Sequence, residues 1–162
     1  MAIRAAVITV SDRAHHGDYE DRSGPVARNA LAAAGFDVAG IVVVPDDVAP
    51  IQEAIRAAIA DGARIVFTTG GTGVAPRDVT PEATAALGGQ ELPGIPEQIR
   101  RRGLANTPLA IASRGLAVAI RDGERSALVV NAPGSRGGAR DAVAVVAEVG
   151  AHVVGQLDGE SH

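Results

Sequence analysis

Short runs of apolar and β-branched residues alternate along the chain with amphipathic segments. Runs of this length, bounded by turn residues, predict buried strands. The predicted strands are Ile3–Val10, Val38–Val44, Ile65–Thr69, Leu116–Arg121 and Ser126–Val130. The last two flank Asp122-Gly123, a pair typical of a hairpin turn.

Apolar residues that recur every three or four positions predict helices between these strands. The clearest case is the trio Ile51, Ile55 and Ile59, which would share one helix face. Ser23 is the expected cap of the first helix and Gly35 its stop. The predicted helices are Val26–Ala34, Val48–Ile59, Thr80–Leu87, Glu97–Arg102 and Ala139–Val154.

The order of these elements predicts an α/β fold. Strands that alternate with helices favour a mainly parallel sheet covered on both faces, a three-layer α/β/α arrangement, with the hairpin as an antiparallel edge. A length of 162 residues fits a single domain over residues 1–162, whose last few residues we expect to be disordered.

Composition excludes several functions. The net charge is −4 and no basic stripe is present, which argues against a nucleic-acid partner. The sequence contains no run of about 18 apolar residues that would predict a membrane span, and its first residues do not show the pattern of a signal peptide. We therefore expect a cytoplasmic protein. The sequence contains no Cys and no Lys. Thiol nucleophiles, Schiff-base lysines and Walker A loops are therefore excluded.

Two conspicuous groups favour ordinary roles. The basic run Arg100–Arg102 is typical of a solvated helix end, although contact with an anionic substrate is the alternative. The pair His15-His16 favours a plain loop over a metal site, because adjacent residues do not share a face.

Polar or glycine-rich loops follow four of the predicted strands. Ligands bind beyond the carboxyl ends of parallel strands, so these loops should converge on one edge of the sheet. The loops begin with Ser11-Asp12-Arg13, Pro45-Asp46-Asp47, Gly70-Gly71-Thr72-Gly73 and Asn131-Ala132-Pro133-Gly134-Ser135.

Two of these loops are candidate anion sites. The backbone N–H groups of Gly70–Gly73 could approach a phosphate closely, although a tight turn explains such glycines equally well. The segment Pro133–Ser135 precedes the last helix, whose amino end favours negative charge, and its alternative is a plain turn.

Three carboxylates should meet at the same edge, namely Asp12, Asp46 and Asp78. Clustered carboxylates repel unless a cation intervenes, and Mg²⁺ typically takes one or two of them together with phosphate oxygens. Asp12 has an equally good structural role as a cap or as the ion-pair partner of Arg13, and Asp47 is expected to cap the next helix.

Four segments together resemble the molybdenum-cofactor biosynthesis family, which includes molybdopterin adenylyltransferases and the corresponding domain of gephyrin. These segments are Ile8–Arg13, Asp21–Pro25, Thr69–Gly73 and Arg77–Ala83. The resemblance implies Mg²⁺ as cofactor, with ATP and molybdopterin as substrates. One departure is Arg136, which stands where the family commonly has a proline.

The resemblance also implies roles for individual residues. Asp46 and Asp78 would be catalytic and would bind the metal. Nucleotide and phosphate contacts would come from Ser11, Asp12, Gly70, Gly71, Thr72 and Gly73. The pterin substrate would be bound by Pro133, Gly134 and Ser135.

The implied activity is the transfer of AMP from ATP to molybdopterin with release of pyrophosphate. The resemblance further implies a homotrimer, with hexamers among related members. Because the sequence shows no fused second domain, we expect the product to pass to a separate molybdenum-insertion enzyme. Three alternatives remain open: a non-catalytic molybdopterin-binding paralogue, a nucleotide pyrophosphatase of the competence-damage type, and an oligomeric scaffold without a small ligand.

Overall fold

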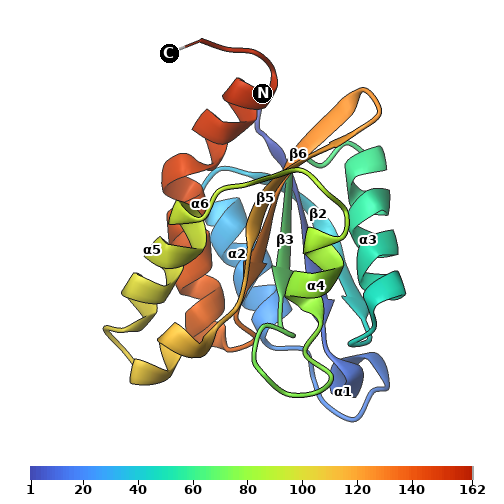
Figure 1. The fold of residues 1–162 in the computed structure, drawn as a ribbon, viewed down its shortest axis with the longest axis vertical. Helices are drawn as coiled ribbons and strands as arrows, with labels where there is room; N and C mark the ends of the chain where they lie inside the picture. Colours follow the sequence, from blue (N-terminus) through green and yellow to red (C-terminus); the bar gives the residue numbers. More distant parts are fainter. Residues whose placement is uncertain (162) are drawn as a thin grey trace.

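A six-stranded sheet with the order β2-β1-β3-β6-β5-β4 lies at the centre of the computed structural model, which describes residues 1–161 (Figure 1). The four strands β2, β1, β3 and β6 are parallel, whereas β5 pairs antiparallel with β6 and β4 antiparallel with β5. The strands are β1 (Arg4–Val10), β2 (Asp37–Val44), β3 (Ile65–Thr69), β4 (Gln90–Glu91), β5 (Ala117–Asp122) and β6 (Arg125–Ala132).

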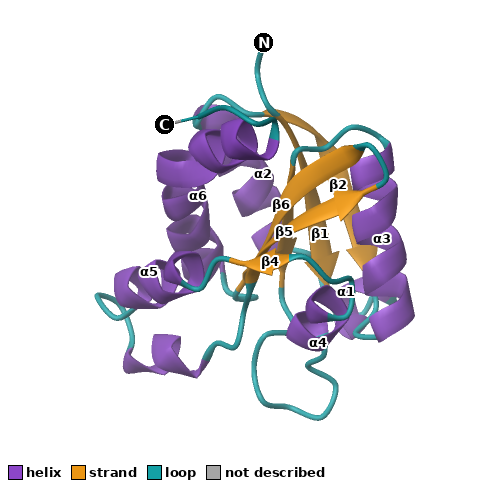
Figure 2. Cartoon of the chain, turned by 45° about the horizontal axis from the view of Figure 1, so that its top comes forward, coloured by secondary structure: helices purple, strands orange, loops and turns teal. Residues whose placement is uncertain are grey.

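Helices cover both faces of this sheet (Figures 1 and 2). On one face lie α2 (Ser23–Ala33), α5 (Gly94–Gly103) and α6 (Arg136–Leu157), and on the other α3 (Val48–Ala60) and α4 (Thr80–Ala85). The expected three-layer α/β/α fold with an antiparallel edge is confirmed.

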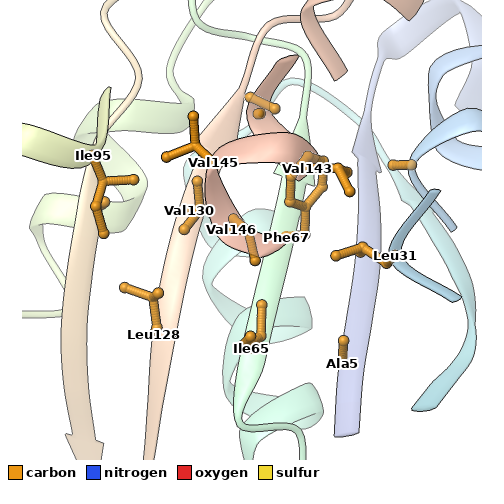
Figure 3. Packing of buried hydrophobic residues seen from close by; sticks show 14 of the residues in the cluster. Ala5, Leu31, Ile65, Phe67, Ile95, Leu128, Val130, Val143, Val145 and Val146 are labelled. Carbon is orange, nitrogen blue, oxygen red and sulfur yellow. The ribbon is translucent and has the colours of Figure 1, made fainter. Parts of the chain in front are cut away.

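Successive strand residues alternate between the two helical layers. Figure 3 shows Phe67 of β3 and Val130 of β6 packed toward Val146 of α6, with Leu31 of α2 beside them. On the opposite face, Val66 packs in the cluster that contains the α3 isoleucines predicted to share a helix face. Burial of aliphatic side chains on both faces is the main stabilising term for such a sheet.

Three short elements were not predicted: α1 (Asp12–His15), β4 and the 3₁₀ helix η1 (Pro108–Ala112). Elements of two to five residues are too short to show periodicity. The basic run lies in the last turn of α5, where Arg102 pairs with Glu148, so the solvated helix end describes it better than an anion contact.

The predicted cap of α2 is wrong. Ser23 is the first helical residue, and the carboxylate of Asp21 accepts the hydrogen bond from the Gly24 N–H at 3.0 Å. Asp21 also accepts a hydrogen bond from the Thr9 hydroxyl of β1 at 2.9 Å. This contact holds the Asp21 carboxylate beside the start of α2, where it takes the capping role predicted for Ser23. Gly35 follows the end of the helix with a φ of +97°, in the left-handed region that suits glycine.

The expectation of disorder at the end of the chain falls partly on His162, which lies outside the described residues. Within residues 1–161, no helix combines the length and the apolar character that a membrane crossing would require.

The strand order creates a topological switch beside β1. The chain passes from β1 to β2 on one side and then returns to β3 on the other side of β1. The loops after β1 and β3 lie together at the lower end of the sheet in Figure 1. Ligands of open parallel sheets bind at such a point.

Candidate active site

A cavity of about 440 Å³ opens at this switch point. It is bordered by the loops that follow β1, β2, β3 and β6. Seven of the predicted site residues line it: Ser11, Asp46, Gly70, Gly71, Asp78, Gly134 and Ser135. The other four, Asp12, Thr72, Gly73 and Pro133, do not.

The first half of the glycine loop requires glycine. Gly70 and Gly71 have φ angles of +102° and +69°. A Cβ on Gly70 would lie 2.3 Å from the carbonyl oxygen of Val10, and one on Gly71 would lie 2.3 Å from the Thr80 hydroxyl. The Thr80 hydroxyl also donates to the Gly70 carbonyl at 2.9 Å. Gly70 and Gly71 therefore form the tight turn and also allow the segments of Val10 and Thr80 to approach the loop closely.

The second half of this loop is anchored away from the cavity by Arg114, which the sequence did not single out. The Thr72 carbonyl accepts from the backbone N–H of Arg114 at 2.8 Å, and the Gly73 carbonyl accepts from its Nε at 2.7 Å. Arg114 Nη2 also donates to the Asp78 carbonyl at 3.0 Å. Thr72 and Gly73 thus hold the loop in place through their carbonyl groups, and a phosphate contact by these two residues stays a prediction.

Asp12 supports the site without lining it. Its carboxylate accepts two hydrogen bonds from Arg77, at 2.8 and 2.9 Å, and one from the Asp46 N–H at 2.9 Å. The hydrogen bonds from Arg77 lower the pKa of Asp12 from 3.8 to about 2, and the hydrogen bond from Asp46 contributes in the same direction. The predicted phosphate contact of Asp12 stays a prediction, whereas the suggested ion pair with Arg13 is wrong, because Arg77 is the partner. Arg13 instead stacks over the ring of Tyr19, 4.6 Å from its centroid.

Asp46 is the partly buried carboxylate of the cavity. Its Oδ2 accepts from the Asp12 N–H at 2.8 Å, and its Oδ1 lies 3.1 Å from where a Cβ on Gly71 would be. Burial raises the pKa of Asp46, the hydrogen bond from Asp12 opposes this, and the charges of Asp12 and Asp78 raise it further. A cation bound here would offset both the cost of burying the Asp46 carboxylate and its repulsion by the neighbouring carboxylates.

Asp78 closes the loop that precedes α4. Its Oδ2 accepts from the Ala75 N–H at 3.0 Å, and the residue lines the cavity. Residue Val79 is the N-cap of α4 and forms no side-chain cap. Asp78 therefore does not cap α4, which leaves it available for chemistry.

Asp47 stands at the predicted cap position of α3, but its side chain makes no capping hydrogen bond. It forms an ion pair with Arg77 at 3.2 Å instead. The predicted position is correct and the predicted hydrogen bond is wrong, because the guanidinium already held by Asp12 lies within reach of Asp47.

The donor set fits a magnesium ion completed by a substrate. Among residues 1–161, no group of three or more His, Cys, Asp or Glu side chains could hold a metal ion alone. Asp46 and Asp78 supply two carboxylates at one cavity, and Mg²⁺ typically takes one or two carboxylates together with phosphate oxygens. Metal binding by this pair stays a prediction.

Ser135 is the N-cap of the 22-residue helix α6. Its hydroxyl oxygen accepts from the Gly138 N–H at 3.0 Å, which leaves the hydroxyl proton free to donate. A Cβ on Gly134 would lie 3.2 Å from Gly70 Cα, so the two anion-site loops meet here. Pro133 lies behind them, where its carbonyl accepts from Thr69 at 2.8 Å. The segment leads directly into the amino end of a long helix, which Ser135 caps.

Several cavity residues were missed as site residues, namely Tyr19, Asp21, Arg22 and Arg136. Arg22 and Arg136 bring positive charge to a cavity that contains three carboxylates, those of Asp21, Asp46 and Asp78. Asp21 and Arg22 lie in one of the segments that carried the family resemblance, which was their only signal. His15 and His16 are not among the lining residues, but the plain loop predicted for them is wrong, because His15 is the last residue of α1 and His16 is its C-cap.

Comparison with known proteins agrees with this geometry. Residues 6–152 match the family model described as "Probable molybdopterin binding domain". A structure of a molybdopterin biosynthesis protein from Mycobacterium abscessus superposes with a TM-score of 0.86 at 45% identity, over 96% of each chain. The chain is 38% identical to the molybdopterin adenylyltransferase of Escherichia coli K12 over 136 residues, which are 82% of this chain and 67% of that protein.

A second kind of relative is longer. The chain is 39% identical over 158 residues to a molybdenum cofactor biosynthesis bifunctional protein of Synechococcus elongatus. This match covers 98% of the chain but only 48% of the relative, so the chain spans about half the length of this bifunctional protein. The family match over residues 6–152, together with the relative in Escherichia coli, shows that the chain belongs to the molybdenum-cofactor biosynthesis family of molybdopterin-binding domains.

Proposed function

We propose that this chain is a nucleotidyltransferase that moves AMP from ATP to the phosphate of molybdopterin and releases pyrophosphate. The observation that carries the proposal is one cavity in which Asp46 and Asp78 meet the backbone of Gly70 and Gly71 and the amino end of α6. The adenylyltransferase of Escherichia coli supports it.

The proposed reaction is a displacement at the α-phosphorus of ATP. An oxygen of the molybdopterin phosphate forms the new bond to this phosphorus. The bond from the phosphorus to the oxygen that bridges to the β-phosphate breaks, and pyrophosphate leaves with the electron pair. Because the phosphate is itself the nucleophile, the enzyme requires no covalent intermediate, which agrees with a chain that lacks Cys and Lys.

The residues of the chain position and neutralise the phosphates. Asp46 and Asp78 would hold Mg²⁺, which supplies positive charge to the reacting phosphates when it is bound. Backbone amides of the glycine loop would bind ATP phosphates. The Ser135 hydroxyl and the amino end of α6 would bind the molybdopterin phosphate, and Arg22 and Arg136 would neutralise the departing pyrophosphate. Catalysis of this kind is mostly orientation and charge stabilisation.

The test is a reaction of the purified chain with molybdopterin and ATP, with and without Mg²⁺, analysed for adenylylated molybdopterin and pyrophosphate. Product that requires all three components supports the proposal. Molybdopterin binding without product would identify a binding paralogue, and ATP consumption without molybdopterin would identify a pyrophosphatase. A chain that binds neither ligand would be a scaffold.

The proposal extends to assembly and to the fate of the product. We infer that the chain works as a homotrimer and delivers adenylylated molybdopterin to a separate molybdenum-insertion enzyme. The bifunctional relative, about twice as long as this chain, supports a partnership with a second activity.

A further inference from the structure

All four carbonyl groups of the glycine loop, Gly70–Gly73, accept hydrogen bonds from the protein. Thr80 holds the first two, with its hydroxyl at 2.9 Å and its N–H at 3.1 Å. Arg114 holds the last two, with its N–H at 2.8 Å and its Nε at 2.7 Å. Two residues therefore fix the orientation of every peptide unit of this loop, which lies in the green segment between β3 and α4 in Figure 1.

This arrangement leaves the N–H groups of residues 71–74 without a protein acceptor. A trans peptide unit is planar, so its N–H points away from the side on which its carbonyl is bonded. Within residues 1–161, no peptide bond is cis and none of these four N–H groups donates to another protein group. Free N–H groups on successive residues are the donors by which glycine-rich loops bind phosphates.

Arg114 also ties Asp78 to the loop. Its Nη2 donates to the Asp78 carbonyl at 3.0 Å, while its Nε holds the Gly73 carbonyl. A Cβ on Gly73 would lie 2.8 Å from Asp78 Oδ2, so the carboxylate approaches the loop closely at this point. One planar guanidinium thus sets the position of this carboxylate relative to the loop, although Arg114 does not line the cavity itself.

The main chain that follows Arg114 is held by the buried Asn131 of β6. Asn131 Oδ1 accepts from the Leu116 N–H at 3.1 Å, and its Nδ2 donates to threonine hydroxyls of β3 and α4 at 3.0 Å each. A Cβ on Gly115 would lie 2.5 Å from the Asn131 carbonyl oxygen, so the chain packs closely on β6 here. Arg114 therefore extends from a segment that is bonded both to the glycine loop and to the sheet.

The ion pair of Arg114 with Glu82 of α4 does not by itself explain this arrangement. The two side chains are 37% and 52% exposed. Ion pairs in such surroundings contribute little to stability. The hydrogen bonds from Arg114 to the Gly73 and Asp78 carbonyls are therefore the main effect of its guanidinium.

We propose that Arg114 is a positioning residue of the transfer reaction, which fixes the Asp78 carboxylate and the free N–H groups of the glycine loop so that they act on the same metal-bound phosphates. The inference rests on the proposed function, because that reaction makes Asp78 a metal ligand. Arg114 acts only through these two neighbours. A displacement of about 1 Å at a reacting group can lower a rate about 100-fold, so the position of this pair matters for turnover.

The test compares two substitutions that weaken the same ion pair. Arg114→Lys keeps the positive charge but replaces the planar fork of donors by one ammonium group, which cannot hold the Gly73 and Asp78 carbonyls in the same geometry. Glu82→Gln removes the negative charge and leaves the hydrogen bonds from Arg114 to both carbonyls in place. If only the ion pair mattered, the two variants would behave alike.

The first measurement is metal affinity without turnover. Mn²⁺ replaces Mg²⁺ as a paramagnetic probe, and an ATP analogue with a methylene group between the α- and β-phosphates prevents the reaction. Titration followed by electron paramagnetic resonance should show that the nucleotide complex of Arg114→Lys binds Mn²⁺ about 10- to 100-fold more weakly than that of the wild type. Glu82→Gln should keep the wild-type affinity.

The second measurement is the single-turnover rate with ATP and molybdopterin. We expect this rate to fall about 10- to 100-fold in Arg114→Lys, with an unchanged KM for molybdopterin. A purely structural role of Arg114 predicts something else, namely a lower melting temperature with wild-type metal affinity and rate at temperatures where the variant is folded.

The control is Arg121→Lys, which makes the same chemical change at an arginine of β5 that donates to the Leu157 carbonyl. It should match the wild type in both measurements. A folded Arg114→Lys chain with wild-type metal affinity and rate would overturn the inference, as would equal losses in Arg114→Lys and Glu82→Gln or a wild-type nucleotide complex that binds no Mn²⁺. If Arg114→Lys does not fold, Arg114→Gln takes its place, and failure of both to fold would assign Arg114 to the fold alone and overturn the inference.

These outcomes separate the inference from the proposed function. Weaker Mn²⁺ binding in Arg114→Lys, together with a wild type that forms no adenylylated product, would reject the adenylyltransferase proposal and keep the positioning role. Product formation by the wild type, with metal affinity and rate unchanged in Arg114→Lys, would reject the positioning role alone.

Discussion

Asp12 and Asp46 exchange backbone hydrogen bonds: the N–H of Asp12 donates to Asp46 Oδ2 at 2.8 Å, and the N–H of Asp46 donates to Asp12 Oδ1 at 2.9 Å. The exchange ties the loop after β1 to the loop after β2. Arg77, from the loop before α4, then binds the Asp12 carboxylate. One carboxylate that does not line the cavity thereby fixes the position of another that does.

The ion pair of Asp12 with Arg77 predicts a specific pH dependence of stability. The pKa of Asp12 is lowered from 3.8 to about 2, so its stabilising contribution is complete above the higher value and is lost as the pH falls through the lower one. In Arg77→Gln, most of this contribution should be absent, because only the hydrogen bond from the Asp46 N–H remains. We therefore expect the wild type to melt at a higher temperature than the variant near neutral pH, and the difference to shrink on acidification from about pH 4 to pH 2.

Arg56→Gln is the matched control for this comparison, because Arg56 of α3 is exposed and forms no ion pair with the rest of residues 1–161. Its melting temperature should follow that of the wild type at every pH. A constant difference between wild type and Arg77→Gln down to pH 2 would show that the pair does not control acid stability.

The sheet and its helices could be predicted because their signals are local. The isoleucines of α3 recur within a dozen residues, and β3 is a short, uniformly buried run that opens with three apolar residues. The support of the site is not local, since Arg77 and Asp12 are 65 positions apart and Arg114 reaches the glycine loop from 41 positions away. A sequence shows that Arg and Asp are present, but only the fold selects their partners.

Gly71→Ala should impair both folding and ATP use. The substitution requires a φ of +69° from a residue with a Cβ and places that Cβ against the Thr80 hydroxyl. We expect a loss of roughly 1–2 kcal/mol from the left-handed backbone alone, with a further loss from the contact. Melting curves and ATP-dependent turnover measure the two effects.

Gly123→Ala separates backbone strain from the close contact. Gly123 has a φ of +62° in the β5–β6 turn, with no other atom within 4 Å of an added Cβ. This variant should lose stability by the backbone term only and keep full turnover. If Gly71→Ala behaves in the same way as Gly123→Ala, the glycine loop does not approach the nucleotide.

Ser135→Ala should affect helix and substrate separately. Loss of the hydrogen bond from Gly138 removes the cap of α6, at a cost of about 1 kcal/mol in the free energy of unfolding. Loss of the hydroxyl donor should weaken molybdopterin binding by roughly 1.5–3 kcal/mol, and ATP binding much less. Ser135→Asn restores a cap and serves as the stability control. Reduced stability with unchanged molybdopterin affinity would leave Ser135 only its structural role.

Assembly is open to direct measurement. We expect a trimer in solution, as the family resemblance implies. An apolar groove of about 490 Å³ between α5 and α6, which includes Ile95 and Val149, is a surface that such an assembly could cover. Light scattering at micromolar concentration measures the mass of the assembly, and a monomer there would contradict this expectation.

Asp78→Asn should leave a folded chain that binds molybdopterin but transfers AMP very poorly. Asn has nearly the same shape and can still accept the hydrogen bond from the Ala75 N–H, so the loop before α4 should keep its conformation. What the substitution removes is the negative charge, and Mg²⁺ would lose a hard ligand.

The loss should appear in the rate more than in binding. Charge on the phosphates grows in the transition state. Removal of an electrostatic contact to these phosphates should therefore lower kcat. A decrease of about 100-fold or more corresponds to the loss of one strong contact of roughly 3 kcal/mol. If Asp78 served only to close its turn, Asn would replace it with near-normal turnover and a small change in melting temperature. The single-turnover rate and the melting temperature, measured on the same preparation, distinguish these outcomes, and wild-type turnover in Asp78→Asn would remove Asp78 from the catalytic machinery.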